Sequence, residues 1–233
     1  MSKQVPGNEI KLIRSIAFMV FAVALCLAAP TASAQIQIVV DRNLGRESNL
    51  AFKFQRVPPP MRDDAAKSAA MLLIAGDVDG NGGDLKALTD DVLPLTADSP
   101  DANFFFDAGT LGGRFRLDLG SAIAISRINT YSWHPDTRGP QVYNLYASAG
   151  DEPGFNPAPD SATHPASCGW KLIANVDTRP KTGETGGQYG VSIFVSNGSI
   201  GTYRYLLFDC GVTESDDDFG NTFYSEIDVI TKK

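Results

Sequence analysis

Residues 113–150 read GRFRLDLGSAIAISRINTYSWHPDTRGPQVYNLYASAG. In the opening segment, Phe115, Leu117 and Leu119 alternate with charged residues. A period of two with one apolar face is typical of an antiparallel strand that packs on a core. A Gly-Ser break then precedes two further apolar strands, the last at 141–148. This region therefore predicts an antiparallel sheet with one buried face.

The rest of the chain predicts further short strands separated by turns. The expected strands are 36–40, 50–55, 69–75, 170–176, 191–195, 203–208 and 223–230. Residues 63–75 also fit a capped helix, but the strand is the preferred interpretation because Met71-Leu72-Leu73-Ile74 suits a buried strand. Many short strands with Gly, Pro, Asn and Asp turns, and no long helical pattern, indicate an all-β antiparallel β-sandwich or jelly roll.

Residues 1–34 have the composition of a bacterial signal peptide. A basic leader precedes an apolar run at 16–29, and Ala32-Ser33-Ala34 matches a small-residue cleavage site. The apolar run is shorter than the roughly 20 residues that span a bilayer. We therefore expect export to a secreted, periplasmic or cell-surface location, with an uncleaved membrane anchor as the alternative.

The net charge restricts the classes of binding partner, and the cysteines bear on a disulfide bond. The formal net charge is −7, which argues against nucleic acid and anionic lipid. Two cysteines, Cys168 and Cys210, follow the leader. In an exported protein such a pair predicts one disulfide bond. The alternative is two buried thiols that pack as small apolar groups.

The loop after the second strand of this region is the best candidate for a binding site. Trp133, His134 and Arg138 lie within six residues of one another. An aromatic ring can stack on the C–H face of a sugar, while His and Arg form hydrogen bonds with hydroxyl groups. The alternative is structural: Trp133 caps the core, His134 satisfies a turn and Arg138 pairs with a surface carboxylate.

The order of strand-sized segments resembles the discoidin or coagulation-factor type C superfamily, which includes the family 32 carbohydrate-binding modules. The segments that carry the resemblance are Leu88–Asp90, Phe115–Gly120, Ile128 with Tyr131–Ser132, Tyr143–Ser148, Tyr203–Leu207 and Ser225–Val229. They cover about 84–230 and imply a galactose-binding-like jelly roll over residues 84–233. Residues 35–83 lie outside the resemblance and are expected to add strands and a loop packed on that core.

The resemblance also implies a function and further site residues. It implies a non-catalytic module that binds carbohydrate, such as a cell-surface polysaccharide, and acts as a monomer. A neighbouring loop would complete the site with Asn221, Phe223 and Tyr224. A structural calcium ion would lie between Asp90 and Glu226, with Asp91 where the family commonly has Gly.

No catalytic motif is visible in the sequence. The chain has two histidines and lacks a nucleophile elbow, an H-E-x-x-H helix and a phosphate-binding Gly loop. We therefore expect no enzyme and no catalytic residues. Two alternatives stay open: a structural or adhesion domain of the cell envelope with a protein partner, and a hydrolase whose paired carboxylates come from different strands.

Overall fold

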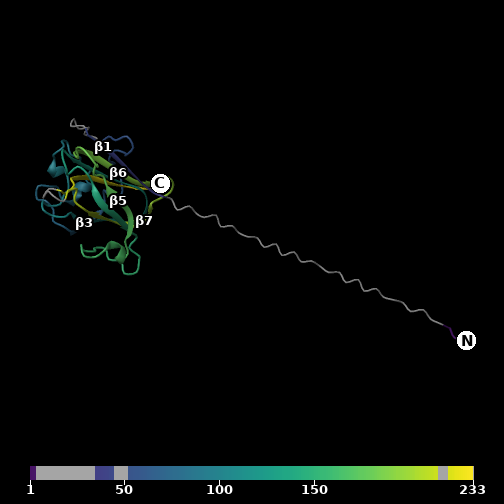
Figure 1. The fold of residues 1–233 in the computed structure, drawn as a ribbon. Helices are drawn as coiled ribbons and strands as arrows, with labels where there is room; N and C mark the ends of the chain where they lie inside the picture. The colour runs from purple at the N-terminus through teal and green to yellow at the C-terminus, as the bar shows by residue number, and fades with distance from the viewer. Residues whose placement is uncertain (4–34, 45–51, 215–219, 233) are drawn as a thin grey trace. The chain divides into compact units, whose positions relative to one another are not determined.

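The computed structural model describes residues 1–3, 35–44, 52–214 and 220–232 (Figure 1). The predicted signal peptide therefore lies almost entirely outside the described residues. In the described part of the chain, no helix is long and apolar enough to cross a membrane.

The described residues contain eight strands and three short 3-10 helices. The strands are β1 Ile36–Asn43, β2 Ala70–Ala75, β3 Gly113–His134, β4 Val142–Ser148, β5 Lys171–Asp177, β6 Gly187–Val195, β7 Gly201–Cys210 and β8 Tyr224–Thr231 (Figure 1). The 3-10 helices are η1 Leu85–Leu88, η2 Pro100–Ala102 and η3 Pro165–Cys168. All strand pairs are antiparallel, which confirms the predicted all-β class.

Strand β3 belongs to both layers of the sandwich. Its first half pairs with β2 and β7, and its second half pairs with β6 and β8. A register shift against β7 separates Asp118 from Ile123. Gly120 lies in this bulge with φ 80°, a conformation that L residues rarely adopt. The predicted Gly-Ser break is therefore a bulge within one strand rather than the end of a strand.

The strand pairings define the composition of the two layers. The first layer contains β2, the first half of β3, β7, β4 and β5, and the second contains β8, the second half of β3, β6 and β1. The core between them holds Phe115 and Leu117 from β3, Leu145 from β4, Phe208 from β7 and Ile227 from β8. The alternation of the opening segment thus places its apolar side chains inside, as predicted.

A segment that precedes β2 covers the outer face of the second layer. Phe52 and Val57 form a buried cluster there with Tyr131 and Trp133. The Phe52 ring lies 5.8 Å from the Trp133 ring in an edge-on arrangement. The predicted strand at 50–55 is wrong for its described residues 52–55, which form no strand, and Phe52 itself has φ 46°.

The predicted disulfide bond is also wrong, because both Cys168 and Cys210 are free thiols. Cys210 is buried in the core between the layers. Cys168 ends η3 and packs on a separate cluster around Trp170 and Leu207. Leu207 precedes the core residue Phe208 and therefore points to the opposite face of β7. The two thiols thus lie on opposite faces of the first layer.

Candidate ligand-binding site

The indole of the predicted binding loop is sealed inside the protein. Trp133 is only 1% exposed because Phe52 and its neighbouring segment cover it. The prediction that Trp133 offers an exposed stacking surface is therefore wrong. The alternation in β3 correctly places this side chain opposite the core, but a second, smaller apolar cluster closes over it.

Arg138 is held between aromatic rings. Its guanidinium lies 4.2 Å from the Phe223 ring centre and 4.6 Å from that of Phe105, and the two rings stack at 3.9 Å. Arg138 Nε donates to the backbone oxygen of Asn221 at 3.0 Å. Cation–π contacts of this kind join the loop to the segment before β8.

The expected neighbouring loop does lie beside this region, but its side chains are buried. Asn221, Phe223 and Tyr224 are each at most 2% exposed. The Asn221 Nδ2 group donates to the backbone oxygen of Asp107 at 2.8 Å. These residues therefore join loops to one another instead of forming an open surface.

His134 is the most accessible of the residues predicted to contact a glycan. Its Nδ1 atom accepts the backbone N–H of Asp136 at 3.1 Å, and its ring meets Phe223 edge-on at 4.6 Å. Burial, together with the nearby Arg138 charge, lowers the pKa of His134. A neutral imidazole is therefore favoured, as the predicted turn role requires.

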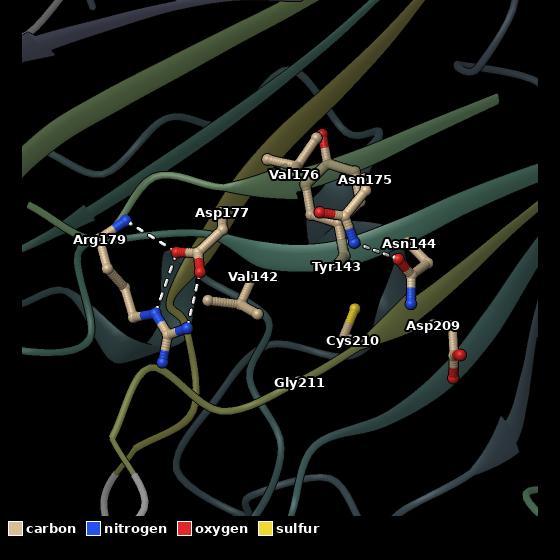
Figure 2. A pocket seen from close by; sticks show the side chains of 10 residues that line it. All are labelled: Val142, Tyr143, Asn144, Asn175, Val176, Asp177, Arg179, Asp209, Cys210 and Gly211. Atoms are coloured by element: carbon tan, nitrogen blue, oxygen red, sulfur yellow. Dashed lines mark hydrogen bonds and ion pairs between the residues drawn. The ribbon is translucent and has the colours of Figure 1, made fainter. Parts of the chain in front are cut away.

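A polar groove lies instead on the outer face of β4, β5 and β7 (Figure 2). It has a volume of about 360 Å³. Its polar lining residues are Asn144, Asn175, Asp177, Arg179 and Asp209. Asn175 Nδ2 donates to Asn144 Oδ1 at 2.6 Å, as Figure 2 shows. The groove is therefore the concave site at which several polar side chains converge.

One part of the groove, beside Val142, is lined by a glycine. Val142 pairs with Asp177 across β4 and β5, and the Gly211 amide donates to the Val142 backbone oxygen at 2.9 Å. A Cβ atom added at Gly211 would come within 3.2 Å of the Val142 side chain. The missing side chain at 211 thus keeps this part of the groove open.

Two ion pairs set the electrostatics of the groove. Arg179 binds Asp177 through Nε at 2.9 Å and Nη2 at 2.6 Å. The hydrogen bonds from Arg179 lower the pKa of Asp177. Asp209 Oδ1 accepts from Arg114 Nε at 3.0 Å. The Asp177 carboxylate is therefore held in the ionised, hydrogen-bond-accepting form.

The groove residues lie within or next to strands that the sequence predicted, but no motif singles them out. Asn144 and Asp209 occupy the polar positions of alternating strands. Their convergence depends on the register between β4 and β7, which pairs Asn144 with Asp209. A sequence pattern gives the face of each strand, but it does not give the register between strands distant in sequence.

The segments of the predicted calcium site do meet. Glu226 Oε2 accepts the backbone N–H of Asp91 at 3.2 Å, and Asp90 Oδ1 accepts that of Val92 at 2.8 Å. Asp91 has φ 64°, the left-handed conformation that favours the Gly common at this position in the family. Burial and then the Asp228 charge raise the pKa of Glu226 to about 9. No set of three or more His, Cys, Asp or Glu side chains in the described ranges could hold a metal ion.

No protein-family model matches the chain. No curated protein matches its sequence either. Among solved structures it is similar to a CBM32 module from a family 31 glycoside hydrolase of Clostridium perfringens, with 12% identity, a TM-score of 0.46, and coverage of 73% of this chain and 99% of that one. It is also similar to a Streptococcus pneumoniae fucose binding module, with 13% identity, a TM-score of 0.45, and coverage of 73% of this chain and 96% of that one. A third similar structure is the lectin domain of lectinolysin in complex with Lewis b antigen, with 10% identity, a TM-score of 0.44, and coverage of 73% of this chain and 98% of that one.

These structures are galactose-binding-like domains, the class that the sequence resembles. At such identities and TM-scores they give no information about the ligand, site or activity of this chain. The ligand is therefore inferred from the chemistry of the groove itself.

Proposed function

We propose that this protein is a non-catalytic carbohydrate-binding module and that the groove on β4, β5 and β7 holds the glycan. The observation that carries the proposal is the convergence of Asn144, Asn175 and Asp209 on one groove that Gly211 helps to keep open. Concave sites with a few convergent polar groups are the usual location of small-ligand binding.

The groove offers what a sugar hydroxyl group needs. A hydroxyl group donates one hydrogen bond and accepts others. Asn144 keeps its Nδ2 donor after Asn175 has bound its Oδ1 acceptor. Asp209 keeps its Oδ2 acceptor after Arg114 has bound Oδ1. Val142 adds apolar contact for the C–H groups of a sugar ring.

The ionisation of the groove favours binding over catalysis. A glycosidase needs a carboxyl group whose raised pKa keeps it protonated as a general acid. The pKa of Asp177 is shifted the other way by Arg179. The proposed role of this carboxylate is therefore to orient Arg179 at the wall of the groove.

The test is binding of soluble polysaccharides by calorimetry or affinity electrophoresis. Gly211 has no left-handed φ, and an added Cβ meets only the Val142 side chain, at 3.2 Å, so a Gly211→Leu side chain needs a small shift of Val142 and would fill this part of the groove. We expect this variant and Asn144→Ala to lose binding, while Gln37→Ala, on exposed β1 in the other layer, binds as the parent protein does. Binding that survives in both groove variants would exclude the groove. A parent protein that binds no glycan but captures a protein partner would favour the adhesion alternative.

We also propose a structural calcium ion near Asp90 and Glu226. The donor chemistry fits, because carboxylate and carbonyl oxygens are the ligands that calcium prefers. Glu226 is 1% exposed, and Asp228, Asp90, Asp64 and Asp91 all disfavour its ionisation, so a bound cation would offset this repulsion. Backbone oxygens would supply the remaining ligands.

Calcium binding predicts a higher melting temperature in millimolar calcium than in chelator, because a ligand of the native state stabilises it. Glu226→Gln should remove that difference. Identical melting curves with calcium and with chelator in the parent protein would refute the proposed ion.

Export is the remaining part of the proposal, and it rests on the composition of residues 1–34. Expression of the full chain in a bacterial host should release a mature protein that begins at Gln35. Amino-terminal sequencing of the exported product tests this. A product that retains residues 1–34 would indicate an uncleaved anchor instead.

A further inference from the structure

One row of polar side chains crosses four strands on the outer face of the first layer. The register pairs Asn175 with Asn144, Asn144 with Asp209, and Asp209 with Arg114. Side chains directly opposite on antiparallel strands lie roughly 5 Å apart at Cβ. The row therefore runs from the groove to a buried arginine.

Arg114 is fixed by more than its carboxylate partner. It is 6% exposed, and its Nη1 donates to the backbone oxygens of Pro159, Asp160 and Thr163 at 3.0, 2.6 and 3.0 Å. Its Nε donates to Asp209 Oδ1. An arginine with this many fixed acceptors has little freedom, so it holds Asp209 in one orientation.

The register between β4 and β7 places this carboxylate next to the side-chain amide of Asn144. An acceptor and a donor on adjacent strands match one hydroxyl group or two neighbouring ones. Among the described residues that line the groove, none offers an aromatic face for stacking, because the ring of Tyr143, from β4, belongs to the core. Recognition here depends on hydrogen bonds.

The charges of the groove determine which sugars fit. Arg179 is already paired at both oxygens of Asp177, and Arg114 is buried behind Asp209. The Asp209 side chain is 31% exposed and that of its partner Arg114 only 7%, so the charged atom nearest to a ligand is a carboxylate oxygen, which disfavours an acidic sugar. The apolar residues and the amides of the groove carry no charge.

We infer that the groove selects neutral, hydroxyl-rich glycan chains over uronic acid chains, with Asp209 as the hydroxyl acceptor and Arg114 as its positioning residue. This inference rests on the proposed carbohydrate function. It adds the ligand class, the anchoring residue and the cause of the selectivity.

The experiment compares neutral polysaccharides with polygalacturonate for the parent protein and for Asp209→Asn. The variant keeps the shape of the side chain and removes its charge. We expect a loss of about tenfold or more in affinity for the neutral glycan, as for a hydrogen bond to a charged group. We also expect the preference for neutral over acidic chains to shrink. The matched control is Asp118→Asn, whose carboxylate pairs with Arg204 on the same layer outside the groove.

Arg114→Lys tests the positioning role, since lysine keeps the charge and loses the planar fork. The double variant with Asp209→Asn should bind as weakly as Asp209→Asn alone, because the two residues act together. Should Arg114→Lys fail to fold, Asp209→Asn still decides the matter. Unchanged affinity in Asp209→Asn, or parent binding of polygalacturonate at least as tight as of neutral glycans, would overturn the inference and leave the carbohydrate function intact. A parent protein that binds no glycan would overturn both.

Discussion

The two outer faces of the sandwich differ in what covers them. On the second layer, Asn129, Tyr131, Trp133, Glu226 and Asp228 all point away from the core, yet each is at most 1% exposed. On the first layer, the outward-facing side chains of the groove at 175 and 177 are exposed. Both faces follow the same strand alternation. Alternation therefore identifies the side of a strand, and not whether solvent or ligand reaches it.

The covering segment satisfies the polar groups that it buries. The Tyr131 hydroxyl group lies 2.7 Å from the backbone oxygen of Pro58 and 3.1 Å from Asp228 Oδ2, so the two acceptors share its one proton. Asp228 Oδ1 accepts the backbone N–H of Met61 at 3.2 Å. Substitutions on this face should thus reduce stability, whereas substitutions in the groove should reduce binding.

The largest expected effect is that of Trp133→Ala. Truncating a fully buried indole should lower the free energy of unfolding by about 3–5 kcal/mol, since it removes contacts and leaves a cavity against Phe52. Denaturant unfolding measures this. Lost glycan binding with unchanged stability would contradict the structure and restore Trp133 as a ligand-stacking residue.

A smaller effect is expected for Tyr131→Phe. The change removes one hydroxyl group and leaves the Pro58 oxygen and one Asp228 contact unmet. Such a loss typically costs about 1–3 kcal/mol. Thermal melting should show it, and glycan affinity should stay unchanged at temperatures where the variant is folded. A stability equal to that of the parent protein would mean that the segment around Pro58 does not close this face in solution.

The contrast between the two outer faces shows which features of the fold and of the site the sequence predicts. The inward positions of β3 and the all-β class follow from the period-two pattern, and Asp90 and Glu226 were placed near each other by the resemblance alone. The burial of Trp133 depends on the segment around Phe52, which shows no strand or helix in the described residues. The Asn144–Asp209 pairing depends on a register between strands far apart in sequence. Cys168 and Cys210 illustrate the same point, because their separation is a matter of which face each occupies.

The pH dependence of the free energy of unfolding tests the role of His134, which ends β3 and begins the loop before β4. The pKa of His134 is lowered in the folded protein, so its charged form is favoured in the unfolded chain. The stability that its neutral form contributes is complete above the unfolded pKa of about 6.5 and is lost as the pH falls from that value through the lower pKa of the folded protein. Glu226 and Asp228, whose pKa values are raised to about 9 and about 6, add an opposite slope that is common to the parent protein and to His134→Gln. We therefore expect the free energy of unfolding of the parent protein, relative to that of His134→Gln, to fall as the pH is lowered from 8 to 5 in denaturant titrations. A difference that does not change with pH would contradict this role of His134.

The smallest effect on stability is expected in the exposed groove of the first layer, for Arg179→Ala. Arg179 and Asp177 are 45% and 43% exposed at their side chains, and an exposed ion pair contributes little because water and salt screen it. The free energy of unfolding should change by less than about 1 kcal/mol. Asp177→Ala should behave alike, and the double variant should be no worse than either single one. A loss comparable with that of Tyr131→Phe would make the groove wall a structural element, and the difference between the two faces would then no longer separate stability from binding.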